Sequence, residues 1–154
     1  MSFNDKFTIK DHQKNDAYYV EGSFMKIPKT FSISNTAGAE VALITKKVMS
    51  FLPKFYVEVN GQEVLTINKE FSFFKARYSI DAAGIEVHGN WWDMNFEVFQ
   101  YGKALGKVNK EWFTWGDSYK VQVLNEEMET IIIALMIAID CVKVDQASSP
   151  PATT

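Results

Sequence analysis

The sequence has one cysteine, Cys141, and only two histidines, His12 and His88, among its 154 residues. A single cysteine excludes an internal disulfide and indicates a reducing compartment, so we expect a cytoplasmic protein. Neither histidine has further ligand-type residues at the spacing of a zinc site, and we therefore expect no bound metal. Cys141 falls at the end of a segment that predicts a buried helix, where a small packed thiol is more common than a nucleophile.

Sequence motifs for phosphate or calcium chemistry are missing as well. The chain contains no glycine-rich phosphate loop, no P-loop and no calcium-binding loop. Asp93 and Glu97 lie near Trp91 and Trp92, but scattered surface charge accounts for these carboxylates better than an acid/base pair does. We therefore predict that the protein is not an enzyme and that it uses no cofactor.

An excess of positive charge is also absent, because the formal net charge is −3. No overall basic field is available to attract nucleic acid. The segment Lys110–Trp115 combines lysine with aromatic residues, as single-strand binders do, but its aromatics fall on the positions of a structural repeat. We expect no nucleic-acid partner. The segment Met1–Asp11 alternates polar and apolar residues and does not resemble a signal peptide.

Hydrophobic runs in this sequence are short. The longest one, Thr130–Ile139, has ten residues and is bracketed by Glu129 and Asp140. As a helix it would measure about 15 Å, half of a hydrocarbon core of ~30 Å. We therefore predict that the chain has no transmembrane span.

The same run predicts a buried helix from Glu126 to about Val144. Asn125 is a suitable N-cap, acidic residues follow it, and Lys143 falls in the last turn. Between these ends the segment is apolar on every side, which is typical of a helix buried all round. A strand, a membrane anchor and a partner-binding helix are the alternatives.

What the chain does contain is one pattern in six copies. A β-branched residue stands two positions after each aromatic anchor, and a large apolar residue stands four positions before it. Another β-branched residue precedes the anchor by eleven positions, except in the first copy, where that position would fall before Met1. The anchors, spaced by 24, 24, 23, 18 and 23 residues, are Phe7, Phe31, Phe55, Tyr78, Phe96 and Tyr119.

Each copy predicts two strands joined by a bend, with hairpin turns such as Asn60-Gly61 between copies. The eleven strands that we predict lie near residues 5–11, 17–24, 29–35, 40–49, 54–60, 63–71, 75–81, 85–91, 94–101, 103–112 and 117–124. Two strands per copy are too few for a propeller blade, and the ladder of a leucine-rich solenoid is absent.

A closed barrel removes the exposed edges of so long a meander. Eleven or twelve strands enclose a lumen that side chains alone do not fill, so we expect the C-terminal helix inside it. The predicted fold is therefore all-β with one central helix, a closed antiparallel barrel of 11–12 strands around a buried hydrophobic C-terminal α-helix.

Four segments carry a resemblance to a known family: Ile44–Phe55, Phe71–Lys75, Trp112–Tyr119 and Ile137–Cys141. From Ser2 to Val144 the sequence resembles the YxjI-like branch of the LURP-one-related family, which is similar in fold to the tubby C-terminal domain and the phospholipid scramblases. The resemblance implies a twelve-stranded barrel around a hydrophobic helix. Tubby-like domains bind phosphoinositides through clustered cations, whereas most members of this branch have no established activity.

The front of the chain departs from this family, whose members usually carry one more strand before the position of Ser2 and Phe3. Either eleven strands close the sheet with a gap, or the sequence begins late. A gap would leave an edge open to a partner strand, and a second copy of the chain could supply it. We therefore expect a homo-oligomer to be feasible through this edge.

Lysines at equivalent positions suggest a binding surface. Nine positions before the anchors of copies three, four and six stand Lys46, Lys69 and Lys110. Strand alternation places each on the same face as the apolar residues two positions away, and together they predict a cationic patch for an anionic headgroup. Residues close in sequence that would extend the patch are Lys47, Lys54, Lys75 and Arg77. The alternative is that the lysines reach water at the rim or pair with Glu40, Glu63 or Glu70.

We predict a single domain over residues 1–145 and a disordered tail over 146–154, where serine and proline gather. The first functional hypothesis is a non-catalytic binding or regulatory barrel with a protein partner. The second is a peripheral protein at the inner membrane face that binds anionic phospholipid through the lysines. The third is a carrier with an apolar ligand beside the helix, which a helix-filled lumen disfavours.

Overall fold

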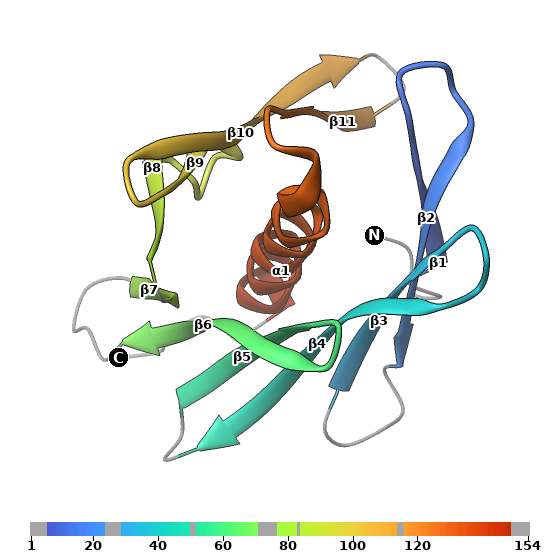
Figure 1. Ribbon diagram of the computed structural model, residues 1–154. Coiled ribbons are helices and arrows are strands. Elements are labelled where there is room, and N and C mark those ends of the chain that lie inside the picture. Colours follow the sequence, from blue (N-terminus) through green and yellow to red (C-terminus); the bar gives the residue numbers. More distant parts are fainter. Residues whose placement is uncertain are drawn as a thin grey trace.

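The computed structural model describes the backbone of residues 6–23, 29–49, 52–70, 77–82, 84–113 and 116–148. In this part of the chain, eleven β-strands surround one α-helix (Figure 1). The strands are β1 (Lys6–Lys10), β2 (Asp16–Ser23), β3 (Lys29–Asn35), β4 (Glu40–Met49), β5 (Leu52–Val59), β6 (Gln62–Glu70), β7 (Arg77–Ala82), β8 (Ile85–Asn90), β9 (Asn95–Gln100), β10 (Lys103–Phe113) and β11 (Gly116–Val123). The 3₁₀ helix η1 (Glu126–Met128) leads into α1 (Glu129–Ser148).

The strands form two antiparallel sheets that follow the order of the chain. One sheet contains β1 to β7, and the other contains β8 to β11. The predicted closure into one barrel is not observed: within the described residues β1 and β11 are sheet edges, and β7 does not pair with β8. The break coincides with the shortest spacing of the repeat, between Tyr78 and Phe96. The architecture is therefore two curled sheets around one helix.

The register of the sheets gives the sequence repeat a physical meaning. In four copies, the β-branched residue eleven positions before the anchor lies directly opposite the one two positions after it. These pairs are Val20 with Ile33, Ile44 with Val57, Ile67 with Ile80, and Val108 with Val121. In copy five the register moves by two residues, so that Val87 faces Val98. Cross-strand pairs of this kind stabilise a sheet, which explains why the spacing recurs.

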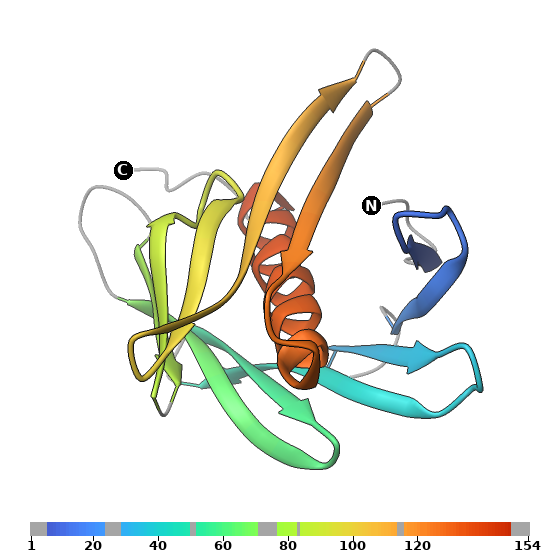
Figure 2. The same ribbon diagram turned by 45° about the horizontal axis from the view of Figure 1, so that its top comes forward.

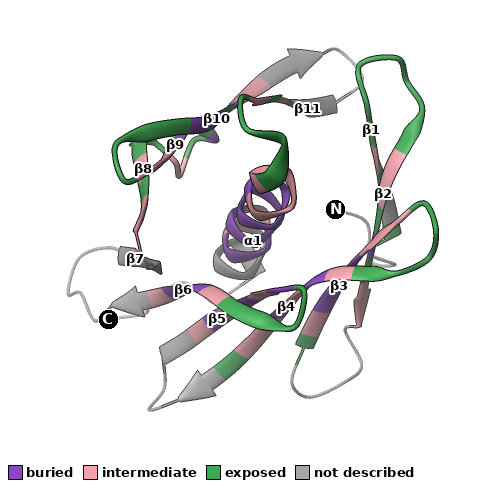
Figure 3. Ribbon diagram, in the orientation of Figure 1, coloured by how far each residue is buried: buried purple, intermediate pink, exposed green. Residues whose placement is uncertain are grey.

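The inner faces of both sheets pack against α1 to make one hydrophobic core (Figure 3). Every residue from Ile132 to Ile139 is buried, with at most 4% of its surface exposed. Full burial of one such aliphatic side chain stabilises the fold by about 1.5–3 kcal/mol. The prediction of a helix buried on all sides is confirmed. Among the helices of the described residues, none is long and apolar enough to span a bilayer.

The sequence predicted the start of the helical segment correctly but not its end. Asn125 is the predicted cap, and its Oδ1 accepts a hydrogen bond from the Glu127 amide at 3.1 Å. The C-terminal boundary was predicted too early, because α1 continues to Ser148 and includes residues assigned to the disordered tail. No proline or glycine interrupts the chain before Pro150, so the helix has no reason to stop at Val144. Lys143 consequently lies before the last turn.

α1 runs in the same direction as β10 in the four-stranded sheet. Near the start of α1, Ile132 packs on Gly106 of β10, where an added Cβ would lie 2.7 Å from the Ile132 Cδ1. Further along, the Tyr119 hydroxyl of β11 donates to Asp140 Oδ1 at 2.8 Å. Figure 2 accordingly shows the red C-terminal end of α1 on the same side as the end of β10.

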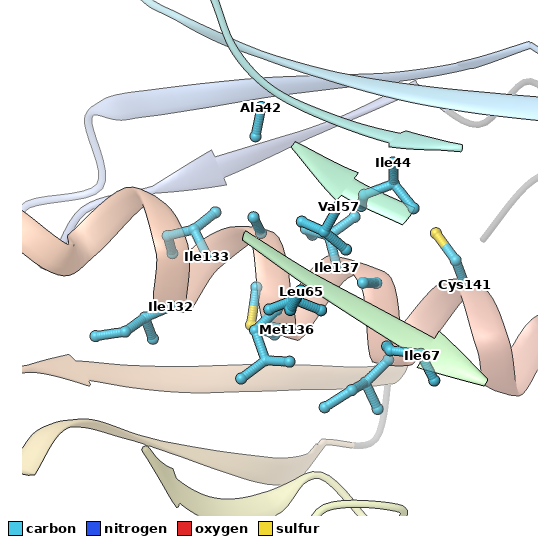
Figure 4. Packing of buried hydrophobic residues seen from close by; sticks show 14 of the residues in the cluster. Ala42, Ile44, Val57, Leu65, Ile67, Ile132, Ile133, Met136, Ile137 and Cys141 are labelled. Atoms are coloured by element: carbon cyan, nitrogen blue, oxygen red, sulfur yellow. The ribbon is translucent and has the colours of Figure 1, made fainter. Parts of the chain in front are cut away.

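The seven-stranded sheet is aligned with α1 in the same way. In Figure 4, Ala42 of β4 lies toward Ile133, and Ile44 lies further along the helix toward Cys141. β4 and β10 thus both run from the beginning of α1 toward its end. We call the side where α1 begins the entry end of the molecule and the opposite side the exit end.

Candidate anion-binding site

The three lysines that the repeat singles out share one structural position. Each lies directly opposite the aromatic anchor of its own copy: Lys46 faces Phe55, Lys69 faces Tyr78, and Lys110 faces Tyr119. Copies two and five have glycine there, since Gly22 faces Phe31 and Gly89 faces Phe96. The position opposite the anchor is therefore a property of the repeat, and lysine occupies it in three copies.

Strand alternation turns these lysines toward the helix side of their sheets. Lys46 follows the buried Ile44 by two positions, and Lys110 follows the buried Val108 in the same way. Both lysines are half-buried. The backbone of Lys69 has the equivalent place after Ile67, while its side chain lies outside the described residues.

The structure brings Lys46 and Lys110 to the same end of the molecule. Both stand near the end of a strand that runs toward the exit end, one in each sheet. Lys110 is opposite Tyr119, whose hydroxyl bonds Asp140 of α1. Lys29 is opposite Lys46 and adds a third ammonium group on that face of the seven-stranded sheet. Lysines from both sheets thus stand at the exit end of the molecule.

Lys47 does not join this group, because consecutive residues of a strand point to opposite faces. It is exposed on the outer face of β4, directly opposite Lys54 of β5. The two Nζ atoms lie 5.1 and 5.2 Å from the centre of the Tyr56 ring. Lys47 and Lys54 therefore form a separate cation–π cluster on the outside of the sheet.

The side chains of the last two candidate residues, Lys75 and Arg77, lie outside the described part of the structure. Lys75 lies outside the described residues. Arg77 begins β7 with its backbone opposite Glu70, and its side chain is likewise outside the description. Their part in the predicted patch stays a prediction.

Two of the three acidic partners suggested for the lysines lie at the wrong end of the molecule. Glu40 begins β4 six residues before Lys46, and Glu63 precedes Lys69 by six residues in β6. Six residues of strand span about 20 Å, which is beyond the reach of a salt bridge. Glu40 instead accepts a hydrogen bond from the Ser32 hydroxyl at 2.7 Å. The side chain of Glu70 is outside the described residues.

Comparison with known proteins supplies the family. The model of the LURP-one-related (LOR) family matches residues 1–140 of this chain. The chain belongs to the LURP-one-related family. The Bacillus subtilis (strain 168) protein YxjI, itself named as uncharacterized, is 30% identical over 142 residues, covering 92% of this chain and 88% of YxjI. An X-ray structure of an Arabidopsis thaliana protein is similar with a TM-score of 0.64 and 14% identity, covering 92% of this chain and 86% of that one.

In this LURP-one-related chain, an acidic group near the exit-end lysines comes from the chain itself. Asp140 accepts the hydrogen bond of Tyr119, the residue opposite Lys110, so its carboxylate favours an ammonium group on this part of β10. A phosphate arriving from solvent would compete for the same ammonium group through charge-assisted hydrogen bonds.

A second feature lies at the entry end and was missed by the sequence reasoning. It is an open pocket of about 710 Å³, which we call the entry pocket. One wall is the β9–β10 turn from Gln100 to Leu105, and the other is the segment Leu124–Glu127 that leads into α1. The sequence marked this region only as a turn and a helix cap. The exposed Tyr101 in a hairpin turn was the available signal, because such turns usually carry Asn, Asp or Gly.

Proposed function

We propose that this LURP-one-related chain is a non-catalytic binding domain in which the two curled sheets act together as one barrel. The observation that carries the proposal is the burial of α1 from Ile132 to Ile139. The helix fills the space between the sheets, so a ligand has to be bound on the outside or at an end. This arrangement disfavours a carrier, whose apolar ligand would need the space that α1 occupies.

A fluorescent fatty acid, cis-parinaric acid, tests the proposal against the carrier hypothesis. We expect no saturable binding, because the buried residues of α1 occupy the space between the sheets. Saturable one-to-one binding, lost in a variant that fills the interior such as Ala138→Phe, would contradict the proposal. A surface variant, Lys107→Phe, is the matched control, since Lys107 is exposed on β10.

A second candidate function is the binding of anionic phospholipid by a peripheral protein at the inner face of the cytoplasmic membrane. It is supported by Lys46 and Lys110, which lie at one end of the molecule and on opposite sheets. Lysines near an anionic membrane surface contribute about 1 kcal/mol each to binding. Lys29 would add to the same field.

Co-sedimentation with vesicles tests the lipid candidate. We expect binding to vesicles that contain phosphatidylserine or a phosphoinositide, no binding to pure phosphatidylcholine, and weaker binding as salt rises. The double variant Lys46→Gln/Lys110→Gln should lose about 30-fold in affinity, given about 1 kcal/mol per lysine and tenfold for every 1.4 kcal/mol. Lys107→Gln/Lys120→Gln removes the same charge from exposed outer positions of β10 and β11 and is the control. Binding that is indifferent to salt, or equal in both double variants, would refute the lipid candidate.

A further inference from the structure

We propose that the entry pocket binds a basic segment of a protein partner, in which a lysine or arginine stands beside an apolar residue. The inference rests on the proposed binding role and specifies a site for it that does not use the lysines of the exit end. The volume of about 710 Å³ lies within the range of about 300–1,000 Å³ that is usual for ligand pockets. The pocket is partly open to solvent, which suits a peptide better than an enclosed small molecule.

Exposed apolar surface is concentrated at this pocket. Among the described residues, three large hydrophobic side chains are exposed: Tyr19, Tyr101 and Leu124. Two of them line the entry pocket, Tyr101 with 82% and Leu124 with 57% of its surface exposed. The Tyr101 ring rests on Gly84, where an added Cβ would come within 2.6 Å of the ring. Apolar groups that stay in water beside a cavity are typical of a docking surface.

The charge of the pocket favours a basic ligand. Its lining contains two carboxylates, Glu126 and Glu127, and one ammonium group, Lys103, which gives a net charge of −2 + 1 = −1. In the part of the chain that the structure describes, none of the three forms an ion pair. A cation entering the pocket would meet two available carboxylates and the exposed ring of Tyr101, which attracts cations through its face.

The same segment does not offer the donors that an anion needs. The amides of Leu124 and Asn125 both donate to the Leu105 carbonyl, at 2.8 and 3.2 Å. The Glu127 amide donates to Asn125 Oδ1 at 3.1 Å, and the Met128 amide donates to the Asn125 carbonyl at 3.0 Å. Because these backbone donors are already used, the beginning of the helical segment is not an open phosphate site of the usual kind. A basic ligand is the chemistry that the pocket fits.

Titration of the ¹⁵N-labelled full chain with three blocked dipeptides tests the inference. The probes are acetyl-Leu-Arg-amide, acetyl-Leu-Gln-amide and acetyl-Leu-Glu-amide, which differ in the charge of one side chain. We expect saturable amide shifts at Leu124–Glu127 with the arginine probe and none with the glutamate probe. The variant Glu126→Gln/Glu127→Gln should bind the arginine probe about tenfold more weakly, as expected for losing charged hydrogen-bond partners.

The control variant is Glu63→Gln/Glu97→Gln, which removes two exposed carboxylates elsewhere and should bind the arginine probe like the parent chain. Unchanged amide spectra outside the pocket verify that each variant is folded. Absence of saturable shifts, equal shifts with all three probes, or equal affinity in both double variants would overturn the inference. If the vesicle assay still shows binding in that case, the inference fails while the proposed binding role stands.

Discussion

Gly106 shows how a single small residue lets the helix pack on the four-stranded sheet. It lies in β10 between Val98 and Val123, beside an irregularity of the β9–β10 register. An added Cβ would lie 2.6 Å from the Gln122 carbonyl oxygen and 2.7 Å from the Ile132 Cδ1. Real Cβ atoms do not approach backbone so closely, so strand β11 or α1 would have to move.

We therefore expect Gly106→Ala to lower the free energy of unfolding by about 1–3 kcal/mol, as other overpacked core sites do. Urea unfolding followed by circular dichroism measures this loss. Lys107→Ala at the next, exposed position should stay within about 0.5 kcal/mol of the parent chain. A Gly106→Ala variant as stable as the parent would contradict the close packing of α1 on β10.

The hydroxyl of Tyr18 is expected to make the stability of the fold depend on alkaline pH. Burial raises the pKa of its hydroxyl above the ordinary value of 10.0, and the nearby charge of Glu129 raises this pKa further. The folded chain therefore holds the Tyr18 proton more strongly than the unfolded chain does. The stability that this preference contributes is complete below pH 10 and is lost as pH rises through the raised pKa.

Tyr18→Phe should reduce the dependence of stability on alkaline pH. We expect the parent chain to lose more free energy of unfolding than the Phe variant does between about pH 9 and about pH 11. Urea unfolding of both proteins at the two pH values measures the difference. Parallel losses in the two proteins would mean that the Tyr18 hydroxyl is not perturbed.

At the scale of elements, α1 determines whether the sheets have a common core. Leu135 is fully buried and Ile133 is 4% exposed. Replacing either with aspartate places an unpaired charge among apolar side chains, at a cost of several kcal/mol out of the roughly 5–15 kcal/mol that stabilises a typical domain. We expect Ile133→Asp and Leu135→Asp to abolish folding, as judged by circular dichroism and gel filtration.

Lys107→Asp is the control for these helix variants, because it introduces the same carboxylate at an exposed position of β10. It should fold like the parent chain. Folded, monomeric Ile133→Asp or Leu135→Asp protein would show that α1 is not the core of the molecule.

The strands were largely predictable from the sequence, because the repeated positions are the residues that face one another in paired strands. Val20 and Ile33, or Ile44 and Val57, recur at a constant separation since each pair faces one another in a hairpin. The end of α1 was less predictable, because Val144 and the polar residues after it neither continue nor break a helical pattern. The separation of the two sheets falls between the consecutive strands β7 and β8, where the repeat spacing is shortest, but a short spacing alone does not indicate that neighbouring strands fail to pair.

The candidate site was predictable in part for the same reason. The equivalence of Lys46 and Lys110 follows from the repeat, and so does their common face. The opposite orientation of Lys47 also follows from strand alternation. The entry pocket was not predictable, because it forms where the β9–β10 turn meets the segment before α1, some twenty residues further along the chain.

At the scale of the whole molecule, function is expected at the two ends of a helix-filled fold. Lysines from both sheets stand at the exit end, whereas the entry pocket carries a net negative charge. The edges β1 and β11 have no partner strand within the described residues, and pairing with a second copy stays a prediction. Both proposed binding surfaces require that α1 remain in place while a ligand is bound.

Hydrogen exchange of the α1 amides is the most direct test of this central claim. If α1 is a permanent core, the amides of Ile132–Ile139 exchange only through global unfolding, and their free energy of opening equals that from urea unfolding. We predict this equality, with and without anionic vesicles. Exchange of these amides through a much smaller free energy, with the strands still protected, would show that α1 leaves the interior, and it would contradict a binding role confined to the ends of the molecule.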